Sequence, residues 1–280
     1  HLIKRLKSIS IDRMAIFWDA KRSARRLTLY PGYKANRTEE KGPEETRRVH
    51  QQMDLMRLRV FPALGIPQVR IEGTNEEGKI IGYEGDDLIY AACQAFSEDS
   101  TIILTTDQDF VQLVSPVVSV ILDLSGEAKV ISERTVRTLM KVKSAEHFLF
   151  KRLISGDSSD RIPGVGGIGP GKGKNGEKGK IWPILAKCRN LDDLFARREE
   201  LRNDPDFKLV FRPQAIKNLL RNLELMDLSL GEGSDHELQS LVMTTILEGV
   251  GEISVGSIQD ALCDNPSLVS ETLNALPYFD

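Results

Sequence analysis

The stretch STIILTTDQDFVQLVSPVVSVILDL, residues 100–124, decides the fold class of this chain. It opens with an apolar run that ends in a loop carrying two aspartates, and VQLV then begins a helical segment. VSVILDL follows as a second apolar run. Uninterrupted apolar runs of this length are typical of strands that are covered on both faces of a parallel sheet. The stretch therefore predicts a strand–helix–strand unit.

The same alternation extends toward the N-terminus. MAIFWDA (residues 14–20) and IPQVRIEG (residues 66–73) indicate two further strands. Between them, a proline followed by acidic residues at 43–45 is typical of the first turn of a helix, which continues through residue 65. DDLIYAACQAF (residues 86–96) indicates another helix. We therefore expect an α/β fold with a mainly parallel central sheet flanked by helices.

The second half of the sequence has a different pattern. After residue 132 the periodicity becomes helical, and we expect a change of domain near Lys143. This divides the chain into an α/β part, residues 1–143, and a helical part, residues 144–280. The segment GPGKGKNGEKGK (residues 169–180) is basic, glycine-rich and of low complexity. From residue 191 onward the sequence indicates helices without a chemical motif.

Composition and charge limit the class of protein. The 280 residues include 40% hydrophobic residues, enough for a sizeable core, and carry a net charge of −3. No apolar run of about 18 residues occurs, so no transmembrane helix is expected, and no signal-peptide pattern is found. Cys93, Cys188 and Cys263 are scattered without metal-ligand spacing, which predicts reduced thiols. We therefore expect a cytoplasmic protein without membrane contact.

Acidic residues gather in four groups at the ends or starts of predicted elements. The groups are Asp19; Glu84, Asp86 and Asp87; Asp107 and Asp109; and Asp157 and Asp160. The carboxyl ends of parallel strands share one edge of a sheet, so Asp19, Asp107 and Asp109 are expected to converge there. Two like charges about 4 Å apart repel by about 4 kcal/mol at an effective dielectric constant of about 20. A cleft lined by these acids therefore needs cations, and hard divalent ions such as Mg²⁺ or Mn²⁺ prefer oxygen ligands.

Each acidic group also has an ordinary explanation when it is taken alone. Acids in the first turn of a helix cap free N–H groups and interact favourably with the helix dipole. Taken alone, EGDD is explained about as well by this role as by a metal site. A single aspartate after a strand is usually a turn residue, and GDSSD alone is typical of a loop. The occurrence of all four groups in one chain favours a metal site.

A glycine-rich turn follows the last acidic group in GDSSDRIPGVGGIGPGKG, residues 156–173. Glycines let the backbone approach a phosphate closely, and the N-terminus of a following helix favours anions. The early part of the chain is basic, with Lys21, Arg22, Arg25, Arg26, Lys34, Arg37, Lys41, Arg47 and Arg48. Basic groups beside clustered carboxylates are what a metal-dependent enzyme acting on nucleic acid requires.

Four ordered motifs within residues 17–173 resemble the 5′-nuclease family, which includes flap endonucleases, phage 5′–3′ exonucleases and the 5′-nuclease domain of bacterial DNA polymerase I. The motifs are FWDAKRSARRLTLYPGYKANR (17–37), GYEGDDLIYAAC (82–93), TTDQDFVQLV (105–114) and LISGDSSDRIPGVGGIGPGKG (153–173). The resemblance implies a PIN-like nuclease core with a helical arch in residues 1–143. It also implies a helix–three-turn–helix DNA-binding part in residues 144–280.

The resemblance implies specific roles for these residues. Two Mg²⁺ or Mn²⁺ ions would be held by Asp19, Glu84, Asp86, Asp87, Asp107, Asp109, Asp157 and Asp160. Lys34 and Arg37 would be the catalytic basic pair on the scissile phosphate, and Tyr33 would stack on a base. Duplex phosphates would be held, with a bound K⁺ ion, by Gly164, Gly166, Gly167, Gly169 and Lys172.

The activity implied is that of a structure-selective, metal-dependent 5′-nuclease. It would act as a monomer on branched DNA or on RNA–DNA primers during replication and repair, in the cytoplasm of a bacterium or of a phage-infected host. No polymerase segment follows the motifs, so a separate nuclease is expected. A ribonuclease that acts on single strands is disfavoured by the duplex-binding element IPGVGGIG.

The family pattern opens with an apolar strand that ends in Asp-Gly, and no such strand precedes Asp19. The chain starts at His1, within what resembles the helix after that strand, so we expect upstream residues to be missing. The absent aspartate favours an alternative function, a non-catalytic module that binds branched DNA.

Overall fold

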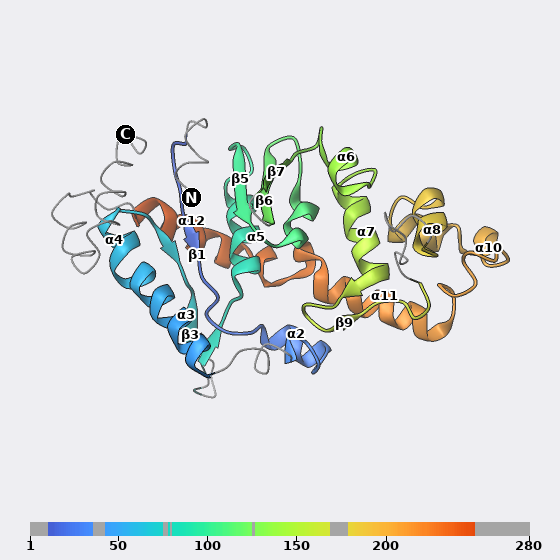
Figure 1. Ribbon diagram of the computed structural model, residues 1–280, viewed down its shortest axis with the longest axis horizontal. Helices are drawn as coiled ribbons and strands as arrows, with labels where there is room; N and C mark the ends of the chain where they lie inside the picture. Colours follow the sequence, from blue (N-terminus) through green and yellow to red (C-terminus); the bar gives the residue numbers. More distant parts are fainter. Residues whose placement is uncertain are drawn as a thin grey trace.

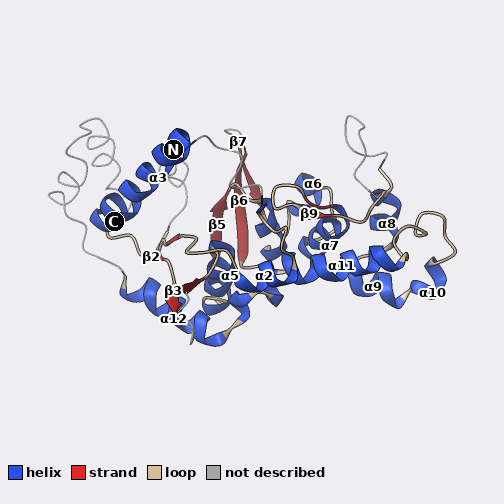
Figure 2. Ribbon diagram, turned by 90° about the horizontal axis from the view of Figure 1, so that it is seen from below, coloured by secondary structure: helices blue, strands red, loops and turns tan. Residues whose placement is uncertain are grey.

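A three-stranded sheet occupies the middle of the molecule (Figures 1 and 2). β5 (Thr101–Thr105) and β6 (Val118–Leu124) are parallel, and β7 (Glu127–Ile131) is antiparallel to β6. The computed structural model describes residues 11–35, 43–74, 78, 80–124, 127–168 and 179–249. The strand pair predicted from residues 100–124 is confirmed.

The segment between β5 and β6 differs from the prediction. It is a 3₁₀ helix, η3 (Gln108–Leu113), that ends before β6 instead of beginning a longer helix. Its apolar residues Phe110 and Val111 are buried against β5 and β6, so packing fixes the short turn. β7 was not predicted either. β7 (EAKVI) pairs with β6 because the two strands are separated by only two residues, and so short a connection allows antiparallel pairing.

A second parallel pair is formed by β1 (Ile16–Phe17) and β2 (Gln68–Val69). The predicted helix between them is confirmed as α3 (Pro43–Leu55), which continues through a π-helical turn, η2 (Met56–Val60), into α4 (Phe61–Ala63). β3 (Glu72–Thr74) and β4 (Ile80–Gly82) form an antiparallel hairpin that leads to α5 (Gly85–Ala95). In the part of the chain that the structure describes, these strands are not hydrogen-bonded to the β5–β6–β7 sheet.

The described residues after 132 are mainly helical. Its principal helices are α6 (Val136–Met140), α7 (Ala145–Ser155), α8 (Ile181–Lys187), α9 (Leu191–Ala196), α10 (Arg198–Leu201), α11 (Pro213–Met226) and α12 (His236–Glu248). A short β8–β9 hairpin (Gly156–Asp157 and Ile162–Pro163) follows α7. The 3₁₀ turns η4 (Leu228–Leu230) and η5 (Glu232–Ser234) connect α11 to α12. No helix in the described residues is both long and apolar enough to cross a membrane.

The buried residues form several clusters, and two elements connect the halves of the chain. α7 places Phe148 in the cluster under the β5–β6–β7 sheet and Phe150 in the cluster of the helical half. α12 returns to the first half, where Val242 packs with Leu88 of α5 and Val69 of β2 (Figure 1). α12 therefore lies with the α/β part.

Candidate active site

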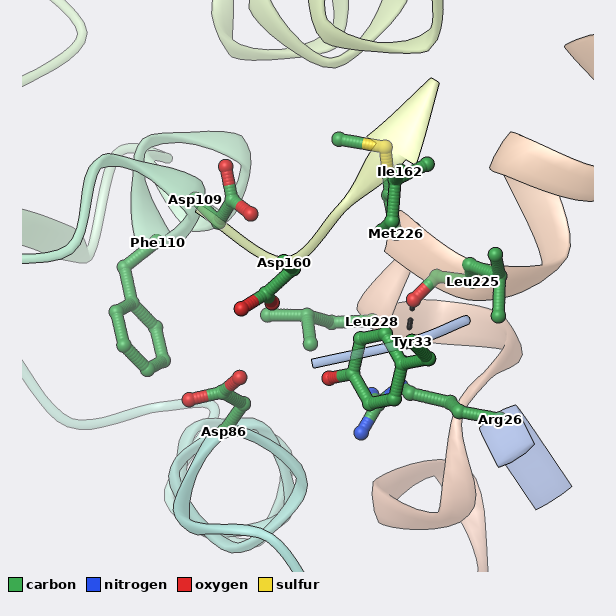
Figure 3. Close-up of a pocket in the computed structure, with 10 residues that line it drawn as sticks. All are labelled: Arg26, Tyr33, Asp86, Asp109, Phe110, Asp160, Ile162, Leu225, Met226 and Leu228. Atoms are coloured by element: carbon green, nitrogen blue, oxygen red, sulfur yellow. Dashed lines mark hydrogen bonds between the residues drawn. The ribbon is translucent and has the colours of Figure 1, made fainter. Parts of the chain in front are cut away.

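Three aspartates from distant parts of the sequence converge on one small pocket (Figure 3). Asp86 lies in the first turn of α5, Asp109 in η3, and Asp160 in the loop between β8 and β9. Apolar side chains, including Phe110 and Ile162, line the pocket together with Arg26 and Tyr33. The carboxylates thus meet at a partly apolar site.

Asp19 and Asp107 fix the backbone next to this pocket. Asp19 follows β1, and its Oδ1 accepts a hydrogen bond of 2.6 Å from the N–H of Gly85 at the start of α5. Asp107 follows β5 and caps η3, because its Oδ1 accepts a bond of 2.8 Å from the N–H of Asp109. Both carboxylates are exposed. Asp107 thus lies beside Asp109, whereas Asp19 contacts the start of α5, so the expected convergence of Asp19 with Asp107 and Asp109 stays a prediction.

The pocket perturbs the acidity of two of its carboxyl groups. Burial raises the pKa of Asp86 to about 7, with the Asp107 charge acting in the same direction and Lys34 opposing it. Burial likewise raises the pKa of Asp109 to about 7, against the effect of Arg152. Near neutral pH these groups are therefore balanced between the neutral and charged forms. A bound cation would shift both toward the carboxylate.

Arg152, in the last turn of α7, connects two of the predicted metal ligands. Its Nε donates to Asp109 Oδ1 at 2.7 Å, and a terminal nitrogen donates to Asp157 Oδ2 at 2.6 Å. Burial alone would raise the pKa of Asp157, but hydrogen bonds from Ser159 and the charge of Arg152 hold this pKa below its ordinary value. Arg152 was not among the residues predicted from the sequence. Its position one helical turn before GDSSD was the available signal.

A second arginine, Arg26 of α2 (Ala24–Leu29), is buried with two more of the predicted ligands. Its terminal nitrogens bind both oxygens of Asp87, at 2.7 and 2.8 Å, and one of them also donates to Glu84 at 2.7 Å. Its Nε donates to the carbonyl of Leu225 at 3.2 Å. Because Asp87 is 0% exposed and both its oxygens bind Arg26, it has no open position for a metal ion in this structure.

Tyr33 and Lys34 complete the arrangement around Glu84. The Tyr33 hydroxyl donates to Glu84 Oε2 at 2.8 Å, and Lys34 Nζ lies 3.1 Å from Glu84 Oε1. Burial alone would raise the pKa of Glu84, but the charges of Lys34 and Arg26 outweigh burial and lower it. Lys34 has a left-handed backbone with a φ of 51°, and its N–H donates to the carbonyl of Asp160 at 3.0 Å.

These contacts differ from two of the predicted DNA contacts. The ring of Tyr33 is packed in the helical core, so the structure does not present it for stacking on a base. The ammonium group of Lys34 is buried beside Glu84 and faces no open phosphate site. The physical reason is the same in both cases, because Glu84 recruits the hydroxyl and the ammonium group. Arg37 lies outside the described residues.

The glycine-rich turn follows β9 and is anchored to α7 by a 2.8 Å bond from the Val165 N–H to the Ile154 carbonyl. A Cβ at Gly164 would lie 2.4 Å from the Ser155 carbonyl oxygen, so this close crossing requires glycine. Gly166 and Gly167 are exposed, and Gly167 has a φ of 81°. Gly169 and Lys172 lie outside the described residues.

The donor set of the site consists of carboxylate oxygens, which suits hard divalent ions. Among the described residues, no group of three or more acidic, His or Cys side chains is already arranged around a single metal position. Internal cations hold several of the carboxylate oxygens that a metal ion would need. The cations are Arg152, Arg26 and Lys34, and the carboxylates are those of Asp109, Asp157, Asp87 and Glu84.

Comparisons with known proteins agree with the geometry. Residues 1–141 match the family described as 5′-3′ exonuclease, N-terminal resolvase-like domain. A 5′-3′ exonuclease of Halalkalibacterium halodurans is 27% identical over 253 residues, which are 87% of this chain and 75% of the relative. The thermostable DNA polymerase I of Thermus filiformis is 35% identical over 205 residues. The match covers 71% of this chain but only 21% of that polymerase.

Solved structures show the same fold. The T5 D15 protein co-crystallised with metal ions has a TM-score of 0.66 and 23% identity, over 89% of this chain and 90% of that one. The zinc-bound T5 5′-exonuclease has a TM-score of 0.67 and 23% identity, with 89% of each chain covered. Both share the PIN-like 5′-nuclease architecture. From its motifs, its fold and the match over residues 1–141, this chain belongs to the 5′-3′ exonuclease family.

Proposed function

We propose that this chain is a metal-dependent phosphodiesterase that cleaves DNA near the 5′ end at branched structures. The observation that carries the proposal is the convergence of Asp86, Asp109 and Asp160 on one pocket next to an exposed glycine turn. Catalysis of phosphodiester hydrolysis requires charge stabilisation where the phosphate is cut and backbone contacts that position the duplex. Asp160 of the pocket precedes β9 and the glycine turn follows it, so both could contact one DNA strand.

The proposed metal ligands are Asp86, Asp109 and Asp160, with Asp19, Asp107 and Asp157 around them. Two Mg²⁺ or Mn²⁺ ions held there would supply an activated water and stabilise the leaving oxygen. The solved relatives crystallised with metal ions support divalent metal use. Glu84 and Asp87 have a different role, because they tie α5 to Arg26 and thereby fix the position of Asp86.

The residues of this chain would position the DNA as follows. Gly166 and Gly167 offer exposed backbone to duplex phosphates, with K⁺ as the expected ion, and Gly169 and Lys172, which follow in the sequence, remain proposed phosphate contacts. Arg37 remains the proposed cationic partner of the scissile phosphate. Lys34 joins it only if its ammonium group separates from Glu84. The T5 flap endonuclease solved with DNA and metal ions supports branched DNA as the substrate class. RNA–DNA primers and a monomeric state are part of the proposal.

One observation favours a second candidate, a branched-DNA-binding module without cleavage. In the described residues, arginine or lysine side chains bind Glu84, Asp87, Asp109 and Asp157, and no group of three or more acids is arranged around one metal position. The two candidates differ in one outcome. The nuclease cuts DNA when a divalent ion is supplied, whereas the binding module retains DNA without cutting it.

The decisive experiment incubates the chain with a 5′-flap DNA labelled at its 5′ end, with Mg²⁺ or Mn²⁺, and with EDTA as a control. We expect release of a short labelled product only with the metal ion. Asp86→Asn should abolish that release, whereas Asp192→Asn should not. Asp192 is a matched control because it is an exposed carboxylate in the first turn of another helix, α9. DNA binding without metal-dependent cleavage would support the binding module instead.

A further inference from the structure

Arg152 bridges two of the carboxylates that are proposed above to lie at the metal site. Its guanidinium group bridges Asp109 Oδ1 and Asp157 Oδ2 at 2.7 and 2.6 Å. The side chain of Arg152 is 21% exposed, and those of Asp109 and Asp157 are 23% and 8% exposed. The bridge therefore lies at the edge of the site, where solvent and ions reach it. It joins η3 of the α/β part to the β8–β9 hairpin.

One carboxylate oxygen does not hold both a short arginine contact and a bound divalent ion without strong repulsion between the two cations. Removal of Arg152 without a replacement cation would leave Asp109 and Asp157 facing each other, with Asp107 near them. The charges of Asp107 and Asp157 already act on Asp109 in the same direction as its burial. The acidic cluster thus needs a positive charge both with and without a bound metal ion. Arg152 supplies this charge in the metal-free protein, and the metal ion supplies it in the metal-bound protein.

We propose that Arg152 is a positioning residue that serves as the resident counter-ion of Asp109 and Asp157 in the metal-free protein and releases at least one of them to an incoming divalent ion. This inference rests on the proposed metal-dependent function. It assigns two roles to one side chain. Arg152 keeps the two carboxylates close while no metal is bound, and it weakens metal affinity because the ion must displace it. The planar guanidinium suits a bridge between two carboxylates better than an ammonium group does.

The test compares Arg152→Met, Arg152→Lys and the wild type. Methionine keeps much of the length of the side chain and removes its charge. Arg25→Met is the matched control, because Arg25 is 29% exposed and pairs with Glu224, and neither of these two residues lines the pocket. The first readout is Mn²⁺ binding by calorimetry. We expect Arg152→Met to bind Mn²⁺ about tenfold more tightly, since no charge-assisted hydrogen bond has to be broken. Arg152→Lys should lie between it and the wild type.

The second readout is thermal unfolding in EDTA. Arg152→Met should unfold at a lower temperature than Arg25→Met, and Mn²⁺ should raise its Tm more than it raises that of the wild type. Adding Asp109→Asn to Arg152→Met should recover part of the loss in EDTA, because the uncompensated repulsion is then reduced. This recovery distinguishes a counter-ion from a side chain that only fills space.

The outcomes separate this inference from the proposed function. If the wild type cleaves DNA and binds Mn²⁺ but Arg152→Met binds Mn²⁺ no more tightly, exchange with the metal is overturned while the function stands. If the wild type binds no Mn²⁺, exchange and the proposed function are overturned together. In either case, the counter-ion role itself is overturned if adding Asp109→Asn to Arg152→Met does not raise the Tm in EDTA.

Discussion

The molecule contains two arginine–carboxylate clusters that use the same chemistry in different surroundings. In the closed cluster, Arg26 holds Asp87 and Glu84, and all three side chains are at most 3% exposed. In the open cluster, Arg152 holds Asp109 and Asp157 at the edge of the pocket. The closed cluster offers no route for a metal ion, whereas the open one does. Burial therefore separates acids that maintain the fold from acids that remain available for chemistry.

The largest expected effect is the loss of the closed cluster. Arg26→Met removes the cation from two buried carboxylates, and a buried pair that loses one partner typically costs about 3–5 kcal/mol. We expect a decrease of that size in the free energy of unfolding, measured by urea denaturation. The neighbouring substitution Arg25→Met should cost less than about 1 kcal/mol, because its pair with Glu224 is more exposed. Equal losses for the two variants would contradict the distinction between the clusters.

A substitution in the open cluster should change the cleavage rate more than the free energy of unfolding. Asp109→Asn is expected to lower the rate of flap cleavage by about 10²–10³-fold, because a proposed ligand of the metal ions that stabilise the reacting phosphate is lost. Its unfolding free energy should change little or increase, since repulsion within the pocket decreases. Asp87→Asn is the matched substitution in the closed cluster, and it should mainly destabilise the fold. Cleavage assays and urea denaturation on both variants check the contrast, which fails if Asp109→Asn is the less stable of the two.

A smaller effect is expected from the backbone that connects Arg152 to Asp157. Gly156 has a φ of 71°, and a Cβ there would lie 2.3 Å from the carbonyl oxygen of Ile162. Gly156→Ala should therefore displace the β8–β9 hairpin and cost about 1–3 kcal/mol. Gly166→Ala is the control, because a Cβ at that residue would meet nothing within 4 Å. Thermal unfolding measures both, and an unchanged Tm for Gly156→Ala would show that the hairpin adapts freely.

A separate expected effect concerns the pH dependence of stability. The pKa values of Asp86 and Asp109 are raised from the ordinary aspartate value of 3.8 to about 7. Between these two pH values, the folded, metal-free protein therefore keeps protons that the unfolded chain has lost. Stability in EDTA should therefore fall as pH rises from about 4 to 7 and then level off. Glu84 in the closed cluster has a lowered pKa, so its contribution is present above the ordinary value and is lost only in acid.

Metal binding should show the opposite trend from metal-free stability. Mn²⁺ must displace the protons of the raised carboxyl groups, so its affinity should be about tenfold greater at pH 8 than at pH 6. Calorimetry in buffers of different ionisation enthalpy would detect the released protons. An affinity that does not change between these pH values would contradict the raised pKa values of the open cluster.

The sequence predicted the elements whose pattern is local. The apolar runs of residues 100–124 became β5 and β6, and the acids at the start of α5 were placed correctly. The pairing of arginines was not predictable. Arg25 and Arg26 are adjacent in sequence, yet rotation along α2 directs one to the exposed Glu224 and the other to the buried Asp87. These contacts depend on packing between α2, α5 and α11, which no local pattern specifies.

The site was predicted in composition but not in detail. Asp86, Asp109 and Asp160 were each predicted as metal ligands from motifs, and the structure places them in one pocket from α5, η3 and the β8–β9 loop. The burial of Tyr33 and Lys34 follows from the demand of Glu84 for donors and from a left-handed backbone at Lys34, which is uncommon for a residue with a side chain. Such conformations are determined by tertiary contacts.

The position of α7 across two hydrophobic clusters has a consequence for how the molecule unfolds. Phe148 and Phe150 stand on one rigid helix but belong to different cores, so neither core loses its packing without disturbing the other. The described parts of the chain should therefore unfold in one cooperative transition, with equal calorimetric and van't Hoff enthalpies. The helix that carries Arg152 thus links the integrity of the acidic pocket to the cooperativity of the whole fold.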